Sequence, residues 1–264
     1  MKNNKIIHAI IFDLSGTLID FGSLATLKTM KKVFKSKGII INNEIIKKDM
    51  GIKKKYHIQK ILSNPLVKNK WFKKYKKPIN NSQLFNLFIS FDKELPKIVK
   101  KNLNLIPNVK NIFKILKKNN IKIGATTGYP KKITKIILSY LKKNKLDLDY
   151  CVSEDEVKKG RPNPDMCIKN LKNLKINNPK KCLKIDDSIS GILEGKKAKM
   201  LTAGLISTGI QMGLSNNVFK KKDKKKLKNK IYKIKKDFKS VDTDIIIDDL
   251  YKLQAILKKD FGIY

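Results

Sequence analysis

The sequence predicts an α/β fold in which a parallel sheet carries helices on both faces and is interrupted by an inserted helical segment. Short apolar runs alternate with helical patterns from Pro107 onward, which is the order typical of a parallel sheet. A first apolar run stands alone and ends at Asp13. Between this run and Val99 the pattern is helical throughout, so the helices are predicted to be inserted after the first strand.

The elements follow in a simple order. Residues 6–12 form a mostly apolar run typical of a buried parallel strand, and a turn follows at Gly16 and Thr17. From about Ser23 to Val99 helices are predicted, with breaks at Pro65 and Pro78. Beyond Pro107, strands are predicted at 121–127, 149–152, 182–185, 200–205 and 244–248, and helices at 109–116, 131–141, 164–174, 189–198 and after 248 to about 258. Ligands bind at the carboxyl ends of such strands, so we expect a core of residues 1–21 and 100–264 with a helical cap of residues 22–99 over that edge.

The balance of charge is strongly basic, with 61 Lys and Arg residues against 22 Asp and Glu residues and a formal net charge of +39. Such a charge suits nucleic acids or anionic membranes as partners. The lysines are spread along the whole chain, however, and even the densest run, 220–236, has the apolar spacing of an ordinary solvated helix. We therefore expect a solvated basic surface, no specific nucleic-acid partner and no membrane partner.

The cysteines indicate a reducing compartment. Cys151, Cys167 and Cys182 are odd in number and form no CxxC pair, which favours buried thiols. No signal-peptide pattern precedes the first apolar run, and no run is long enough to span a bilayer. The expected location is the cytoplasm.

Polar residues lie at the ends of the predicted strands. Asp13 follows the first strand in FDLSGT (12–17), Arg161 lies in KKGRPNP (158–164), and the ends of two other strands carry Thr126 with Thr127, and Asp186 with Asp187. Each of these alone would suit a helix cap or a turn. Together they offer a carboxylate nucleophile, hydroxyl donors, a cation and a pair of acids for a hard metal ion, which is the set that phosphoryl transfer needs.

These residues resemble the four motifs of the haloacid dehalogenase superfamily. The resemblance implies a Rossmann-like core with Asp13 as the nucleophile that forms an aspartyl-phosphate. It also implies a Mg²⁺ ion held by Asp13, the backbone carbonyl of Ser15 and Asp187. Phosphatases of this superfamily carry a second Asp two residues after the nucleophile, and this acid protonates the leaving alkoxide. Ser15 stands there in this chain and cannot serve as that acid, so either activity is impaired or the leaving group needs different help.

The predicted cap contains a more specific pattern. Its segment DMGIKKKYH (49–57) resembles the Met-Gly-x-x-Lys-x-x-His signature of the phosphonoacetaldehyde hydrolase family, and further matches lie at 21–22, 121–129, 160–170 and 212–215. The resemblance implies hydrolysis of the C–P bond of phosphonoacetaldehyde to acetaldehyde and phosphate, with Lys54 as the imine-forming residue and a homodimer built through the cap. The chemistry of the residues alone leaves Lys53, Lys54 and Lys55 open. The resemblance further implies a substrate site formed by Met50, Gly51, Thr126, Thr127, Gly128 and Arg161.

Imine chemistry explains why no acid is needed at position 15. A protonated imine on Lys54 accepts electrons, so the carbon can leave as an enamine. The lysine must be partly neutral, and burial together with the flanking lysines would lower its pKa. His57 follows three residues later on the same helical face and is expected to shuttle protons; a structural histidine is the alternative.

One departure from the family pattern concerns the late acidic motif. The family reads Gly-Asp-Thr-x-x-Asp, whereas this chain reads DDSISG (186–191). Gly191 replaces the last acid, and Asp186 replaces the first glycine. This resembles mutase-type relatives in which adjacent acids both serve the metal, so our hypothesis is that Asp186 restores the lost negative charge as a further metal ligand.

Two other functions are also compatible with parts of the sequence. A phosphomonoesterase or phosphomutase of the same superfamily is favoured by DDSISG and opposed by Ser15 and Lys54. A basic nucleic-acid-binding protein is opposed by the dispersed lysines. Arg161 is the only arginine in the chain. The resemblance places it at the third motif of the superfamily, a cation that holds the transferred phosphoryl group and steadies the nucleophile. We expect its planar fork to grip two oxygens of a phosphonate, which a lysine cannot do.

Overall fold

A six-stranded parallel sheet forms the centre of the core, with the strand order β3-β2-β1-β4-β5-β6. The structure is a computed structural model that describes residues 6–221 and 224–264. The strands are β1 (Ala9–Phe12), β2 (Lys122–Thr127), β3 (Tyr150–Ser153), β4 (Cys182–Asp186), β5 (Leu201–Leu205) and β6 (Ile245–Ile247). All predicted strands are present, because each apolar run is buried and bounded by turns. The strand order reverses direction at β1, so the carboxyl ends of β1, β2 and β4 meet at the crevice where this fold binds ligands.

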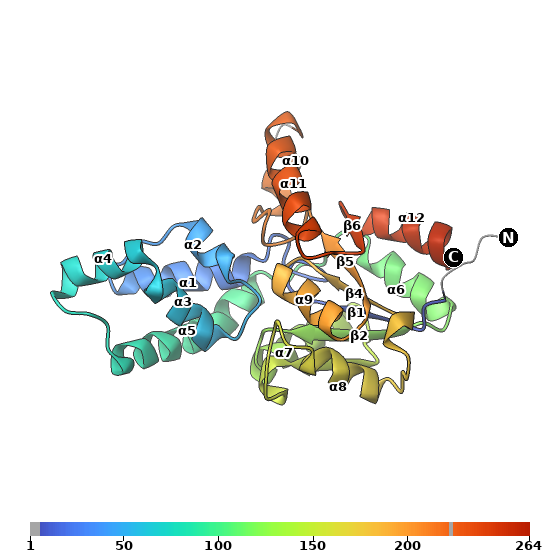
Figure 1. The fold of residues 1–264 in the computed structure, drawn as a ribbon, viewed down its shortest axis with the longest axis horizontal. Coiled ribbons are helices and arrows are strands. Elements are labelled where there is room, and N and C mark those ends of the chain that lie inside the picture. Colours follow the sequence, from blue (N-terminus) through green and yellow to red (C-terminus); the bar gives the residue numbers. More distant parts are fainter. Residues whose placement is uncertain (1–5, 222–223) are drawn as a thin grey trace.

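Helices cover both faces of the sheet (Figure 1). Alternate residues of β1 point to opposite faces, with Ile10 and Phe12 in one buried cluster and Ala9 and Ile11 in another. The first cluster includes side chains of α6 (Val109–Lys118), α7 (Lys131–Lys143) and α12 (Leu250–Phe261). On the other face lie α8 (Asp165–Asn173) and α9 (Ile189–Lys197). The predicted α/β class with helices on both faces is confirmed.

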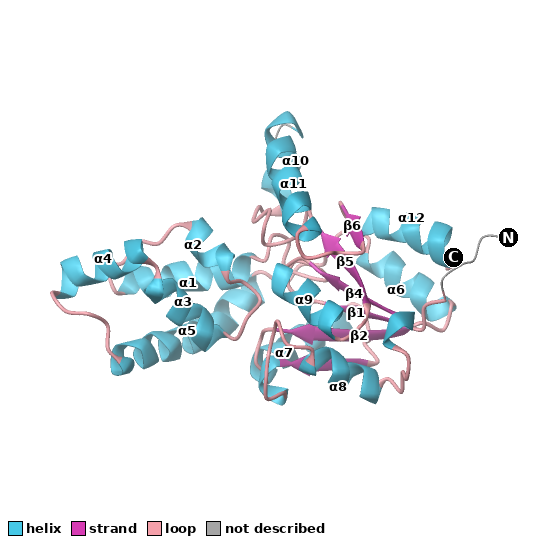
Figure 2. Cartoon of the chain, in the orientation of Figure 1, coloured by secondary structure: helices cyan, strands magenta, loops and turns pink. Residues whose placement is uncertain are grey.

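The segment between β1 and α6 is helical (Figure 2). It consists of α1 (Leu24–Ser36), α2 (Asn43–Lys48), α3 (Lys54–Ser63), α4 (Pro65–Tyr75) and α5 (Asn81–Lys101). Pro65 begins α4, where its missing N–H costs nothing, and Pro78 lies in the loop before α5. These helices form a cap beside the carboxyl edge of the sheet (Figure 1).

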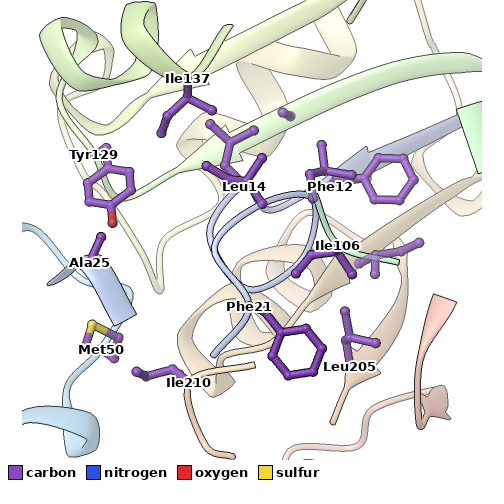
Figure 3. Close-up of a cluster of buried hydrophobic side chains, with 14 of the residues drawn as sticks. Phe12, Leu14, Phe21, Ala25, Met50, Ile106, Tyr129, Ile137, Leu205 and Ile210 are labelled. Atoms are coloured by element: carbon purple, nitrogen blue, oxygen red, sulfur yellow. The ribbon is translucent and has the colours of Figure 1, made fainter. Parts of the chain in front are cut away.

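A buried cluster joins the cap to the core (Figure 3). Ala25 and Met50 of the cap lie near Tyr129 and Ile210 of the core. The hydroxyls of Thr26 and Tyr129 are 3.0 Å apart and share a hydrogen bond across this junction. The cap is therefore held against the sheet edge by apolar packing and polar contact together.

The lysine-rich run forms α10 (Asn216–Lys221) and α11 (Lys224–Lys239), and its residues 222 and 223 lie outside the described part of the chain. Leu227, Ile234 and Phe238 of α11 are buried against Ile192 and Ile206, so the basic helix packs on the core through an apolar face. Within the described ranges, no helix combines the length and apolar character needed to cross a membrane. Cys151, Cys167 and Cys182 are free thiols.

Candidate active site

A cavity lies at the carboxyl ends of β1, β2 and β4, beneath the cap. The space between its side chains is about 360 Å³, including the part that opens to solvent, which suits a small molecule. The cap and the loop leading into it contribute Ser23, Thr26, Met50, Gly51 and Lys54. The core contributes Asp13, Ser15, Thr127, Gly128, Tyr129, Arg161, Asp187, Ser188 and Ile210. Nine of the residues named from the sequence therefore meet in one place.

Asp13 lies directly after β1 and is held by its backbone, because its N–H donates to the carbonyl of Ile185 at 2.8 Å. The chain then turns at Gly16, whose φ is +91° and which has no room for a Cβ atom between Ser23 and the Asp187 carboxylate. Only glycine fits both demands. Burial and the neighbouring Asp186 raise the pKa of Asp13 to about 6, although the Arg161 guanidinium opposes this shift.

Three carboxylates could share a metal ion. Oxygens of Asp13, Asp186 and Asp187 lie within 4.8 Å of one another, and all three residues are buried. The pKa of Asp187 is raised by burial, by Asp13 and by Asp186, so the cluster has an excess of negative charge. The buried Glu194 adds a fourth carboxylate. Among the described residues, the ion pairs of this group involve only the cations Arg161 and Lys184, and the nearby Lys54 has a pKa lowered by burial. A hard divalent cation on oxygen ligands would balance this excess.

The expected metal-facing groups are close together. The Ser15 carbonyl accepts a hydrogen bond from the Ser23 hydroxyl at 2.7 Å, and the same hydroxyl lies 3.2 Å from Oδ2 of Asp187. This oxygen of Asp187 also accepts the N–H of Ile210 at 2.7 Å. The Ser15 hydroxyl donates to Asp20 at 2.8 Å, so it is committed to ordering the loop and supplies no acid.

Arg161 lies between the nucleophile and the side chains behind it. Its side chain is 2% exposed, and each of its three guanidinium nitrogens has a protein group within contact distance. Nη1 lies 2.9 Å from Oδ1 of Asp13, Nε donates to Glu194 at 2.9 Å, and Nη2 lies 3.1 Å from Asp186. Nη2 also donates to the carbonyl and hydroxyl of Thr126. The fork therefore steadies the nucleophile, as the third-motif cation is expected to do, while its two-point grip on the substrate stays a prediction for a residue that lines the cavity.

Thr126 differs from the expectation. Its fully buried hydroxyl accepts from Arg161 at 2.9 Å and from Lys184 at 2.8 Å, and it donates to Glu194 at 3.0 Å. The hydroxyl therefore uses all its hydrogen-bonding capacity behind the cavity, where it supports Arg161, and Thr126 is absent from the described lining. Thr127 and Gly128, which follow it, line the cavity.

The structure separates the three cap lysines. Lys54 is the first residue of α3, is 4% exposed and lines the cavity, where its Nζ lies 5.3 Å from the ring centre of Tyr129. Lys53 reaches backbone carbonyls at 157 and 158, and Lys55 is exposed. Burial lowers the pKa of Lys54, with Glu154 opposing the shift and Arg161 adding to it.

His57 is fully buried, and its Nε2 donates to the carbonyl of Ile46 at 2.8 Å. Burial and the charge of Lys54 lower its pKa to about 3, so the ring stays neutral near pH 7. It is absent from the described residues that line the cavity. His57 is thus a buried neighbour of Lys54 whose Nδ1 has no hydrogen-bond partner among the described residues, and its role as a proton shuttle stays a prediction.

Three buried charged residues beside Lys54 and Asp13 were not predicted from the sequence. Glu154 is 9% exposed beside Lys54, and burial raises its pKa to about 7. Lys184 and Glu194 are fully buried behind Asp13. A lysine in the middle of the apolar strand CLKI (182–185) was the available signal, because a buried charge needs a partner.

Comparison with known proteins agrees with this geometry. The family model described as haloacid dehalogenase-like hydrolase matches residues 10–205. A phosphonoacetaldehyde hydrolase from Latilactobacillus sakei subsp. sakei (strain 23K) is 36% identical over 96% of this chain and 96% of its own length. A bifunctional phosphonoacetaldehyde hydrolase/aminoethylphosphonate transaminase from Clostridioides difficile (strain 630) is 32% identical, and this chain spans 40% of its length.

Solved structures show the same fold. A phosphonoacetaldehyde hydrolase-like protein from Oleispira antarctica superposes with a TM-score of 0.93 at 27% identity, covering 99% of this chain and 95% of the other. A β-phosphoglucomutase from Clostridium difficile reaches a TM-score of 0.68 at 19% identity over 97% and 98% of the two chains. The second likeness concerns the fold alone.

Proposed function

Because the chain belongs to the phosphonoacetaldehyde hydrolase family of haloacid dehalogenase-like hydrolases, we propose that it hydrolyses the C–P bond of phosphonoacetaldehyde. The observation that carries this proposal is the meeting of Lys54 and Asp13 in one cavity. An ester phosphatase needs the carboxylate alone, whereas cleavage of a C–P bond also needs a group that makes carbon a leaving group. A buried amine of lowered pKa is suited to that task.

The proposed reaction has two covalent stages. The neutral amine of Lys54 condenses with the aldehyde and releases water, which leaves a protonated imine. The Asp13 carboxylate then attacks phosphorus, the C–P electrons move into the imine to form an enamine, and phosphate becomes bound to Asp13. Protonation and hydrolysis of the enamine release acetaldehyde and restore Lys54, and water releases phosphate from Asp13.

The residues fit Mg²⁺ as the proposed cofactor. Asp13, Asp187 and the Ser15 carbonyl would hold the ion, and their hard oxygens are the ligands it prefers. When bound, the ion would neutralise charge on the transferred phosphoryl group. Arg161 would hold Asp13 in place, and the cap would position Lys54 in the cavity. Gly128 and Thr127 would leave room for the substrate.

Trapping the imine tests the proposal directly. Borohydride reduction in the presence of phosphonoacetaldehyde should leave a covalent adduct on Lys54 in the wild type. The same adduct should form in Lys55→Ala, a matched control on the same helix with an exposed side chain, and it should be missing in Lys54→Arg. An adduct on a different lysine, or none during turnover, would overturn the imine mechanism.

A phosphomonoesterase or phosphomutase is the alternative for the same site. Ser15 argues against it, because its hydroxyl is bound to Asp20 and supplies no proton to an alkoxide. Hydrolysis of simple phosphate esters that survives in Lys54→Ala would favour this alternative.

We propose a core of residues 1–21 and 100–264 and a cap of residues 22–99, and a cytoplasmic location with the free thiols reduced. We also propose a homodimer through the cap, which exposed apolar side chains on α4 and α5 support, namely Leu66, Phe72, Phe85 and Ile89. Sedimentation of the wild type and of Phe85→Ser/Ile89→Ser would test it: the variant should be monomeric if the cap forms the interface.

A further inference from the structure

Helix α9 turns two glycines toward strand β4, where most helices would place side chains. Gly191 and Gly195 are four residues apart and so share one helix face. A Cβ atom at Gly191 would overlap the carboxyl group of Asp186, and one at Gly195 would lie 2.8 Å from Cβ and Cγ of Lys184. Lys184 and Asp186 are two residues apart in β4 and so point to the same face of the sheet. The glycines therefore leave the space that these two charged side chains fill.

Asp186 directs both carboxylate oxygens toward groups of its own chain: Oδ1 accepts hydrogen bonds, whereas Oδ2 lies at ion-pair distance from two cations without an aligned hydrogen bond. Oδ2 lies 2.9 Å from Nζ of Lys184 and 3.1 Å from Nη2 of Arg161. Oδ1 accepts from the N–H and the hydroxyl of Ser188, at 3.0 and 2.7 Å. Asp186 has no exposed surface and is absent from the described lining of the cavity, whereas its neighbour Asp187 lines it.

We propose that Asp186 is a positioning residue, and not a metal ligand, whose carboxylate fills the space that a side chain at position 191 would take. The space between Lys184, Arg161 and α9 needs one buried carboxylate. An acidic side chain at either position 186 or position 191 can provide it. In this chain β4 supplies it, and Gly191 makes the room.

The carboxylate acts on the reaction through Arg161. Asp186, Glu194 and Thr126 hold the guanidinium so that Nη1 remains on Oδ1 of Asp13. Without Asp186, the buried cations Lys184 and Arg161 would share Glu194 and Asp13, and an underpaired buried charge draws the remaining partners toward itself. The Asp13 carboxylate would then lose the orientation it needs for attack on phosphorus. This inference concerns the nucleophile of the superfamily site, so it stands whether or not the substrate is a phosphonate.

A swap of the two positions tests the proposal. The variants are Asp186→Gly, Gly191→Asp, the double variant Asp186→Gly/Gly191→Asp, and Asp186→Asn, which keeps the shape of the side chain. Binding of trifluoroberyllate, an analogue of the phosphoryl group on an aspartate, reports on Asp13 without any organic substrate and can be followed by ¹⁹F NMR. Calorimetry measures Mg²⁺ affinity, thermal unfolding reports folding, and kcat and KM are measured where turnover is found.

Asp186→Gly should weaken trifluoroberyllate binding and lower kcat by a factor of about 10 or more, with KM little changed, because Arg161 would no longer orient the nucleophile. Gly191→Asp alone should lower Tm, because the new side chain would overlap the Asp186 carboxylate and place two like charges in one buried space. The double variant should recover most of the activity and binding, a strong coupling between two residues that touch. Asp186→Asn should keep Mg²⁺ affinity within about threefold, while Asp187→Asn should abolish it.

Two results would overturn the proposal. One is a double variant no better than Asp186→Gly in trifluoroberyllate binding, which would show that position 191 cannot supply the carboxylate. The other is loss of Mg²⁺ binding in Asp186→Asn as complete as in Asp187→Asn, which would make Asp186 a ligand. Because both readouts use the metal and an inorganic analogue, a failure to cleave phosphonoacetaldehyde would leave this inference intact.

Discussion

The guanidinium of Arg161 and the carboxylate of Asp13 face each other at 2.9 Å, with both side chains buried. The remaining nitrogens of Arg161 are bound to Glu194, Asp186 and Thr126. The only arginine in a chain of lysines thus joins the nucleophile to three other groups at once, which a single ammonium cannot reproduce.

Arg161→Lys should therefore be strongly impaired although it conserves charge. A lysine would leave Glu194 or Asp186 underpaired, and breaking a buried pair costs about 3–5 kcal/mol in stability. We expect kcat to fall by about 100-fold or more, since Asp13 loses its orientation. Steady-state kinetics and thermal unfolding check this, with the exposed Lys159→Ala as the control. Turnover close to the wild type would contradict the role of the fork.

Glu154 should set the pH at which Lys54 becomes reactive. Burial lowers the pKa of Lys54, and the negative charge of Glu154 raises it again. In Glu154→Gln the opposing charge is gone, so the pKa of Lys54 falls further and more of the amine is neutral at a given pH.

The acid limb of imine formation should consequently move to lower pH in Glu154→Gln. The rate of borohydride trapping, measured across pH, gives this limb directly. Glu44→Gln, on an exposed residue of the cap, should leave the profile in place. A limb that stays put or moves to higher pH would show that Glu154 does not act on Lys54.

Gly128 should be needed for the fit of the cap on the core. A Cβ atom at this position would lie 2.6 Å from the carbonyl oxygen of Gly51, which belongs to the cap. The Ser190 hydroxyl donates to the neighbouring Met50 carbonyl at 3.2 Å, so the two parts already touch closely here. Gly128→Ala should push them apart, raising KM about tenfold or more by loosening the substrate site.

The global stability of Gly128→Ala should change little, because the strain lies at the junction and not within the core. Thermal unfolding measures this, and the kinetics measure KM. A variant with unchanged KM would mean that the cap does not need this contact for binding.

Mg²⁺ should stabilise the folded chain, because the buried carboxylates have an excess of negative charge. At 100 times its Kd, the ion should add about 2.7 kcal/mol to the free energy of unfolding. Asp187→Asn should remove this gain, while Asp242→Asn, an exposed position away from the cavity, should keep it. Thermal unfolding with Mg²⁺ and with EDTA gives both values. A full gain in Asp187→Asn would place the ion elsewhere.

The sequence was sufficient for the fold and for the positions of the reactive groups. The apolar runs located every strand of the sheet, because a parallel strand that is buried on both faces must consist mostly of apolar residues. It was insufficient for roles that depend on partners. Thr126 was assigned to the substrate, yet contacts with Lys184 and Glu194, remote in sequence, use the hydrogen-bonding groups of its hydroxyl.

The contacts of His57 could not be predicted from the sequence either. Its spacing from Lys54 correctly predicted a shared helix, since both residues are buried on α3. What spacing could not show is the Ile46 carbonyl on the neighbouring helix α2, which holds the imidazole. Burial by other segments, and not the local pattern, decides whether such a residue reaches the substrate.

The two glycines of α9 also bear on how the chain folds. Each costs about 1 kcal/mol of helix propensity relative to alanine, and a helix of this length is marginal alone in water. Helix α9 should therefore be stable only while it is docked on β4, and fraying of α9 would expose the charges that orient Asp13. Local melting of this one helix would silence the enzyme well before the sheet unfolds, and hydrogen exchange of the α9 amides would follow the loss of activity in mild denaturant.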